Sequence, residues 1–168
     1  MGEPAAQPVG MHLAEVQRVL DALAAAGCTA WLGGGWGVDA LVGRQTRPHR
    51  DLDLLVEAAR LDDALRALGR SGYVVETDWL PVRVEVAAPG DRWVDLHPVV
   101  FDADGNGVQA GPDGTTFDYP EGCLVRGRIG DREVGCLGIA HQLEAHAGYP
   151  PREVDRHDLA LLRELAEG

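Results

Sequence analysis

Two aspartates stand two residues apart in the run Asp51-Leu52-Asp53, which begins a short apolar stretch. Side chains two positions apart on a β-strand project from the same face, so both carboxylates point one way while Leu52 and Leu54 point the other. Adjacent carboxylates repel each other, and each raises the pKa of the other unless a cation lies between them. Mg²⁺ takes such carboxylates together with substrate phosphates. The pair therefore indicates a magnesium site, and the alternative is a solvated strand face on which aspartates alternate.

A run of three glycines, Gly33-Gly34-Gly35, precedes the aspartates at the junction of a predicted strand and a predicted helix. The backbone amides of such a turn and the N-terminus of the following helix can hold phosphate oxygens. The alternative is a tight turn that needs positive φ angles. The spacing fits neither the dinucleotide fingerprint G-x-G-x-x-G nor a phosphate-binding loop that ends in G-K-[ST]. The order of strand, glycine turn, helix and D-x-D strand predicts that phosphates and metal meet at one end of the sheet.

A third carboxylate is expected from a neighbouring strand, and two candidates exist. Asp95 shares a strand face with His97 in a run of alternating apolar and polar residues. Glu85 shares a face with Arg83 on the partner strand of a predicted hairpin, whose turn is residues 88–91. The alternation predicts all four polar side chains on one sheet face, which core packing does not explain. The alternative is a set of cross-strand ion pairs on a solvated face.

Basic residues cluster just before the two aspartates, in a chain that is otherwise acidic. They are Arg44, Arg47, His49 and Arg50. Guanidinium forks match phosphate oxygens, so we expect Arg44 or His49 to contact the β and γ phosphates of a nucleotide. The alternative for each residue is a side chain solvated in a loop.

The composition excludes several classes of function. The 168 residues carry a formal net charge of -12, and all 15 basic residues are arginines. Without lysine the chain has no P-loop lysine, no Schiff-base lysine and no lysine-rich patch, and its acidic surface repels DNA or RNA. Such a surface suits a cationic small substrate, although acidity more often serves solubility. No apolar run approaches the roughly 20 residues of a membrane span, so we expect a cytoplasmic protein without a membrane partner.

Hydrophobic periodicity predicts one α/β domain over residues 12–168, after a flexible leader at residues 1–11. Gly27 ends the first helix, Asp155 caps the last one, and the C-terminal helices occupy about residues 138–167. The three cysteines are odd in number and lack metal-like spacing, so we expect them to be buried and reduced. The predicted helices are residues 12–26, 36–42, 61–70, 139–147 and 154–166. The predicted strands are residues 28–32, 51–56, 73–76, 82–87, 92–100 and 124–129, with a short strand around Phe117 and a loop at 102–114.

Six sequence blocks occur in a characteristic order. They are GGWGVD at 34–39, R-x-H-R-D-L-D at 47–53, W-x-P-x-R-x-E at 79–85, D-L-H-P at 95–98, H-x-G-Y at 146–149 and D-x-H-D at 155–158. Together they resemble the short lincosamide nucleotidyltransferases, within the DNA-polymerase-β-like nucleotidyltransferase superfamily. The first two blocks also resemble the 2''-aminoglycoside nucleotidyltransferases, and the later blocks favour the lincosamide branch. Gly33 departs from the aspartate of the lincosamide enzymes, and His97 departs from the acidic residue of the aminoglycoside enzymes.

The resemblance implies an α/β (α+β) fold of the polymerase-β type, a mixed sheet flanked by helices with a small C-terminal helical extension. It implies an enzyme that transfers AMP from ATP to a hydroxyl of a lincosamide such as lincomycin or clindamycin, releases pyrophosphate and confers antibiotic resistance. One alternative is the same chemistry on an aminoglycoside or another hydroxylated natural product. Another is a non-catalytic nucleotide-binding or toxin–antitoxin-type module. The oligomeric state stays open between a monomer and a homodimer.

The resemblance also implies roles for individual residues. Asp51 and Asp53 would hold Mg²⁺ against the ATP triphosphate, and Asp95 would accept the proton of the drug hydroxyl and serve as a third metal ligand. Nucleotide contacts are expected from Gly34, Gly35, Arg44, His49, Asp51 and Asp53. Drug contacts are expected from Trp79, Arg83, Glu85, His97 and Tyr149.

Overall fold

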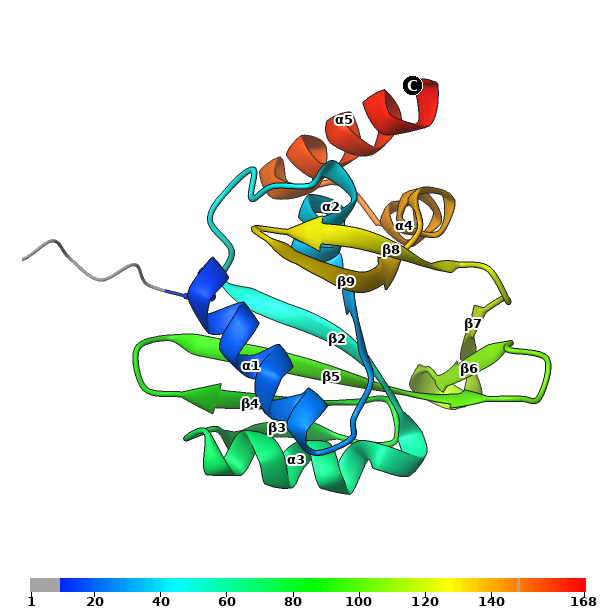
Figure 1. The fold of residues 1–168 in the computed structure, drawn as a ribbon. Helices are drawn as coiled ribbons and strands as arrows, with labels where there is room; N and C mark the ends of the chain where they lie inside the picture. Colours follow the sequence, from blue (N-terminus) through cyan, green and yellow to red (C-terminus); the bar gives the residue numbers. More distant parts are fainter. Residues whose placement is uncertain (1–9, 148) are drawn as a thin grey trace, which may run out of the picture.

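The centre of the structure, a computed structural model that describes residues 10–147 and 149–168, is a mixed sheet (Figure 1). Its strands are β1 (Ala30–Gly33), β2 (Asp51–Glu57), β3 (Val74–Trp79), β4 (Arg83–Ala88), β5 (Arg92–Phe101), β6 (Gly107–Ala110), β7 (Thr116–Tyr119), β8 (Leu124–Ile129) and β9 (Arg132–Leu137). Seven of them lie in the order β3-β4-β5-β2-β1-β9-β8, while β6 pairs with β5 and β7. β2 runs parallel to β5 and β1 parallel to β9, whereas the other neighbours are antiparallel. The predicted fold class is confirmed.

The helices form two groups around the sheet. They are α1 (Leu13–Ala25), α2 (Gly34–Val42), α3 (Leu61–Arg70), α4 (Ile139–His146) and α5 (Glu153–Glu167). α1 and α3 pack against each other, whereas α2, α4 and α5 pack together near β8 and β9 (Figure 1). No helix in the described part of the chain is long and apolar enough to cross a membrane.

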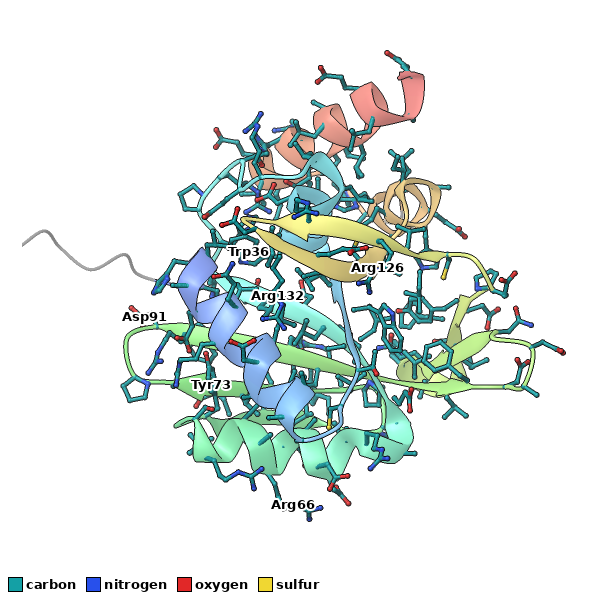
Figure 2. All side chains as sticks on the ribbon, viewed as in Figure 1. Trp36, Arg66, Tyr73, Asp91, Arg126 and Arg132 are labelled. Atoms are coloured by element: carbon teal, nitrogen blue, oxygen red, sulfur yellow. The ribbon has the colours of Figure 1, made fainter. Side chains whose placement is uncertain are left out.

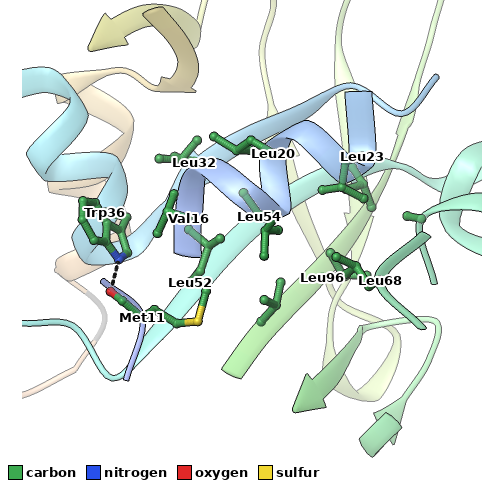
Figure 3. Close-up of a cluster of buried hydrophobic side chains, with 14 of the residues drawn as sticks. Met11, Val16, Leu20, Leu23, Leu32, Trp36, Leu52, Leu54, Leu68 and Leu96 are labelled. Carbon is green, nitrogen blue, oxygen red and sulfur yellow. Dashed lines mark hydrogen bonds between the residues drawn. The ribbon is translucent and has the colours of Figure 1, made fainter. Parts of the chain in front are cut away.

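The alternation of strand β2 separates the core from the acidic face. Leu52 and Leu54 are fully buried and pack in one cluster with the apolar stripe of α1, which includes Val16 and Leu20 (Figure 3). Burial of a leucine side chain contributes about 1.5–3 kcal/mol, so this face fixes which way the strand points. The aspartates of β2 therefore project from the opposite face, as the period of the strand predicts.

The last two residues of the predicted leader, 10 and 11, pack within the domain. Residues 1–9 of the leader lie outside the described residues, whereas Met11 is 1% exposed and belongs to the core. The carbonyl oxygen of Met11 accepts a hydrogen bond from Trp36 Nε1 at 3.1 Å (Figure 3). Met11 N in turn donates to the carbonyl oxygen of His49 at 3.0 Å. Residues 10 and 11 are thus part of the domain, and they support the loop that leads into β2.

A buried acid on α1 fastens this helix to the sheet. Tyr73 lies close to α1 (Figure 2). Its hydroxyl donates to the carboxylate of Glu15 at 2.7 Å. Arg92, at the start of β5, donates to the same carboxylate at 3.0 Å. Burial raises the pKa of Glu15, but hydrogen bonds from Arg18 and Tyr73 outweigh it and leave the pKa lowered. The pair of Glu15 and Arg92 anchors the strand that carries Asp95 three residues later.

The last helix begins much as the sequence predicts. Arg152 is the N-cap of α5, and its backbone N–H donates to the carboxylate of Asp155 at 2.9 Å. Asp155 therefore stabilises the helix start from the third helical position rather than from the N-cap. Hydrogen bonding to Arg152 lowers the pKa of Asp155 to about 2. The three cysteines are unbridged, with Cys28 and Cys136 buried and Cys123 half-buried.

Two features of the predicted element order are wrong. Residues 102–114 do not form a continuous loop, because Gly107–Ala110 pairs as β6 with β5 and β7. Strand β9 is missing from the prediction, since Gly135 interrupts its apolar pattern. A Cβ on Gly135 would lie 2.5 Å from the Trp31 ring of β1. The glycine that weakens the strand signal is therefore the one that lets β1 and β9 pack.

Candidate active site

Three carboxylates stand in one line across three adjacent strands. Asp53 on β2 is the direct neighbour of Asp95 on the parallel strand β5, and Asp95 is the direct neighbour of Glu85 on the antiparallel strand β4. Directly opposite side chains of neighbouring strands lie on the same face, roughly 5 Å apart. Asp51 precedes Asp53 by two positions and projects from that face too. The structure thus brings together the acids that the sequence places on β2, β4 and β5.

His97 and Arg83 close around the middle acid of this row. His97 Nε2 lies 3.5 Å from Asp53 Oδ1 and 3.6 Å from Asp95 Oδ2. Arg83 Nη1 donates to Asp95 Oδ2 at 2.6 Å. The other oxygen, Asp95 Oδ1, is buried and has no hydrogen-bond partner among the described residues. A buried oxygen without a donor is a position that a cation or a substrate proton can satisfy.

The carboxylate oxygens of this row fit a hard divalent cation. One oxygen each of Asp53 and Asp95 and one nitrogen of His97 lie within 4.8 Å of one another. Asp51 adds a further carboxylate on the same face, and carboxylates are the ligands that Mg²⁺ takes together with phosphate oxygens. The buried Asp95 Oδ1, which lacks a partner in the described part of the chain, supports the same fit.

Burial and repulsion weaken the acidity of two aspartates in this site. Burial is the main cause that raises the pKa of Asp95 to about 6. The charges of His97 and Arg83 oppose this rise, and the charge of Asp53 adds to it. The pKa of Asp51 is raised too, first by burial and then by the charge of Asp53. A carboxyl group with a raised pKa in a cleft is suited to accept a substrate proton near neutral pH.

The glycine turn brings the backbone up against the acids. Gly33 is the N-cap of α2, and Gly34, the first residue of that helix, has φ +54°. A Cβ on Gly34 would collide with Asp53 Oδ2, and a Cβ on Gly35 would lie 2.7 Å from His49 Nδ1. Glycine is therefore required for both the positive φ and the close approach. The free N–H groups of the helix N-terminus lie beside the carboxylates, where they can hold phosphate oxygens.

Gly34→Ala should lower turnover by about 100-fold, because an active-site displacement on the order of 1 Å has an effect of that size. The matched control is Gly43→Ala, at another positive φ of +96° where an added Cβ meets nothing within 4 Å. Both variants lose about 1–2 kcal/mol from the left-handed backbone, as unfolding in urea would report. Equal losses of turnover in the two variants would contradict the close approach to Asp53.

A cavity of about 600 Å³ opens beside Asp51 and Asp53, a size within the roughly 300–1,000 Å³ of small-ligand pockets. The cavity lies between the glycine turn and the basic cluster before β2 on one side and the helices α4 and α5 on the other. Its wall includes Gly34, Gly35, Arg47, His49, Tyr149 and Asp158. A second cavity of about 410 Å³, between α1, β1 and β9, is lined by none of the expected site residues.

A buried aspartate, Asp39, fixes the position of His49 by a hydrogen bond, and the sequence did not mark it as a site residue. His49 is 5% exposed and Asp39 is fully buried, with His49 Nε2 2.5 Å from Asp39 Oδ2. Thr46 N donates to the same Asp39 oxygen at 3.0 Å. These hydrogen bonds outweigh the effect of burial and lower the pKa of Asp39. With Nε2 engaged, His49 Nδ1 is the nitrogen that faces Gly35 in the cavity.

An ion pair connects the basic cluster before β2 to the last helix, α5. Arg47 donates from Nε and Nη2 to the two carboxylate oxygens of Asp158, at 3.0 Å and 2.8 Å. The two side chains are 18% and 3% exposed. Asp39 and Asp158 both lie within the recognised sequence blocks. Their partners are 10 and 111 positions away in the sequence, so no local pattern predicts either contact. Gln142, which lines the cavity and donates to the carbonyl of Gly34 at 3.3 Å, lies outside every block.

The remaining expected contact residues divide between two sides of the acidic row. Trp79 is 54% exposed, and the guanidinium of Arg83 lies 4.1 Å from its ring centre. These two residues lie with Glu85 and His97 on the side of β3, β4 and β5. Tyr149 lies apart from them, in the cavity beside Asp51 and Asp53. Arg44 is exposed and does not line that cavity.

A mixed sheet with acids in register, beside a glycine turn at a helix N-terminus, is the arrangement expected of a nucleotidyltransferase. The chain belongs to the aminoglycoside-2''-adenylyltransferase family, whose model matches residues 15–162.

Relatives of two kinds resemble the chain over most of its length. A lincosamide resistance protein of Staphylococcus haemolyticus is 33% identical over 151 residues, which covers 90% of this chain and 94% of the relative. A crystal structure of the lincosamide antibiotic adenylyltransferase LnuA, with lincomycin bound, superposes with a TM-score of 0.85 at 32% identity and covers 93% of this chain and 99% of that chain. A 2''-aminoglycoside nucleotidyltransferase of Escherichia coli is 30% identical over 113 residues, or 66% of this chain and 61% of the relative.

Proposed function

We propose that this protein transfers AMP from ATP to a hydroxyl of a lincosamide such as lincomycin or clindamycin, with release of pyrophosphate. The observation that supports the chemistry is the direct pairing of Asp53 with Asp95 beside the glycine turn. The observation that supports the drug class is the likeness to a lincosamide resistance protein over 90% of the chain. We infer antibiotic resistance as the outcome, and a cytoplasmic location because ATP is the co-substrate.

Asp51, Asp53 and Asp95 would hold Mg²⁺. When bound there, the ion neutralises phosphate charge and stabilises the attacking and leaving oxygens. Asp95 accepts the proton of the drug hydroxyl at Oδ1, since Arg83 already donates to Oδ2. The hydroxyl oxygen then bonds to the α-phosphorus, and the bond from that phosphorus to the bridging oxygen breaks with its electron pair leaving on pyrophosphate.

The rest of the site aligns the two substrates on either side of the acids. The backbone amides of Gly34 and Gly35 would hold phosphate oxygens at the start of α2. Arg47 and His49 face the same cavity, so we propose them, rather than Arg44, as the basic residues nearest the phosphates. Tyr149 lines this cavity as well, and we place it with the nucleotide.

The drug would lie on the opposite side of the acidic row, against Trp79, Arg83, Glu85 and His97. Holding two reactants in line in this way accounts for much of the acceleration in transfers of this kind.

The raised pKa of Asp95 predicts a dependence of activity on pH. A general base must be ionised, so kcat/KM should fall about tenfold per pH unit below the pKa of Asp95, which is about 6 in the metal-free protein. A bound cation favours the ionised carboxylate, so the apparent pKa should fall below about 6 as the Mg²⁺ concentration rises. Profiles of kcat/KM against pH at several Mg²⁺ concentrations, with buffers of constant ionic strength, measure this. An apparent pKa that does not change with Mg²⁺ would contradict the role of Asp95 as both base and metal ligand.

The aminoglycoside alternative is favoured by two observations. The matching family model is that of the aminoglycoside-2''-adenylyltransferases, and a net charge of -12 suits a polycationic substrate. Mass spectrometry of lincosamides and aminoglycosides incubated with the protein, ATP and Mg²⁺ separates the two. We expect an added AMP on lincomycin and clindamycin. An added AMP on aminoglycosides alone would show that they, and not lincosamides, are the substrates. If no drug in the panel is modified, a non-catalytic nucleotide-binding module would be favoured.

A further inference from the structure

His97 has a partner on each ring nitrogen, and the two partners differ in kind. Its Nε2 points at the carboxylates of Asp53 and Asp95, at 3.5 Å and 3.6 Å. Its Nδ1 lies 3.2 Å from the amide nitrogen Nε2 of Gln109. Gln109 is 2% exposed and lies on β6, within the segment that the sequence predicted as a loop.

The neighbours of Gln109 fix which end of its amide faces the histidine. Gln109 Nε2 also lies 3.0 Å from the carbonyl oxygen of Val82, which can only accept a hydrogen bond. At the other end, the hydroxyl of Tyr119 donates to Gln109 Oε1 at 2.7 Å. A flipped amide would place two acceptor oxygens against each other at Val82. The amide nitrogen therefore donates one hydrogen to Val82 and the other to His97.

Tyr119 is itself held in position. Its ring stacks on His141 of α4 with centroids 5.0 Å apart, and burial raises the pKa of its phenol to about 12. The hydroxyl thus remains a donor throughout the neutral range. A hydrogen-bonded chain of the buried Tyr119 and Gln109 and the half-buried His97 thus runs from the helix α4 to the acidic row.

We propose that Gln109 is a positioning residue that holds His97 with its proton on Nε2, so that His97 donates toward Asp53 and Asp95 and does not ligate the metal. A neutral imidazole has one donor and one acceptor nitrogen, and the Gln109 amide requires Nδ1 to be the acceptor. The nitrogen that faces the acids is then a donor. The cation is left with oxygen ligands, which suits Mg²⁺, whereas an imidazole lone pair would favour transition metals and zinc.

Nuclear magnetic resonance of ¹⁵N-histidine-labelled protein, without metal or nucleotide, tests this placement of the proton. Burial lowers the pKa of His97, but the hydrogen bond and charge of Asp53 outweigh it and leave the pKa raised, so the spectra are recorded at a pH at which the imidazole is neutral. The wild-type spectrum should then show His97 protonated at Nε2 and bare at Nδ1, with the signal assigned by its loss in His97→Gln. Gln109→Glu offers an acceptor to Nδ1 and should move a proton onto that nitrogen. Gln17→Glu makes the same change on α1, away from the site, and should leave the His97 signals unchanged.

Two results would overturn the proposal. One is a wild-type spectrum with the proton on Nδ1, which decides the matter even when Gln109→Glu does not fold. The other is a folded Gln109→Glu whose His97 signals match the wild type. Gln109→Met, close in size but without a donor, should give signals averaged between the two tautomers. It should also lower kcat by about 10- to 100-fold with the KM for ATP unchanged.

The consequence for catalysis rests on the proposed function, but the position of the proton does not. Wild-type protein with the proton on Nε2 and no turnover of any drug would refute the transferase activity alone. Turnover of lincomycin with the proton on Nδ1 would refute the role of Gln109 alone.

Discussion

Asp95→Asn should reduce the turnover of lincomycin by about 10²–10⁴-fold, the usual contribution of a positioned general base. Asparagine keeps the volume of the side chain and can still accept the hydrogen bond from Arg83, but it cannot take a proton from the drug hydroxyl. Pyrophosphate release measured at saturating ATP and Mg²⁺ reports the loss. The matched control is Asp118→Asn, an exposed aspartate on β7, which should keep wild-type turnover.

The same variant should gain stability in the absence of metal. Because the folded pKa of Asp95 is raised from 3.8 to about 6, the native state binds more protons than the unfolded state across that interval. The free energy of unfolding therefore falls as the pH rises from about 4 to 6, by on the order of 2–3 kcal/mol. Asp95→Asn removes this loss, so its Tm at pH 7 with EDTA should equal or exceed that of the wild type. A lower Tm for the variant would contradict the cost assigned to the buried charge.

Asp158→Ala should have the largest effect on stability, about 3–5 kcal/mol, since it leaves a largely buried guanidinium without its carboxylate. Arg47 donates two hydrogen bonds to Asp158, and its side chain is only 18% exposed. Urea unfolding followed by circular dichroism measures the loss. Glu164→Ala, at an exposed position of the same helix, should stay within about 0.5 kcal/mol of the wild type.

A double variant separates the structural role of the pair from its role in the site. Arg47→Met with Asp158→Leu replaces the buried pair by apolar side chains of similar size, which often restores stability. We expect the double variant to be more stable than Asp158→Ala. Its KM for ATP should still be higher than that of the wild type, because Arg47 lines the cavity. Restored stability together with a wild-type KM for ATP would show that Arg47 only fastens the helix α5.

The sequence alone determined which side chains share a face. The period of two of a β-strand is a local property, so it placed Asp51 and Asp53 together, and Asp95 beside His97, without knowledge of the partner strands. The glycine turn was predicted on the same basis, because a need for positive φ arises within a few residues of the backbone.

Only the tertiary structure decided how these faces meet. The register that sets Asp53 against Asp95 depends on the parallel pairing of β2 with β5, which core burial fixes over the whole sheet. Gln109 contacts His97 from β6, a strand that the glycine-rich sequence of its segment did not predict. Asp158 contacts Arg47 across 111 positions. Periodicity is set by neighbouring residues, whereas partners are set by the packing of the complete chain, and the partners decide where each proton and charge lies.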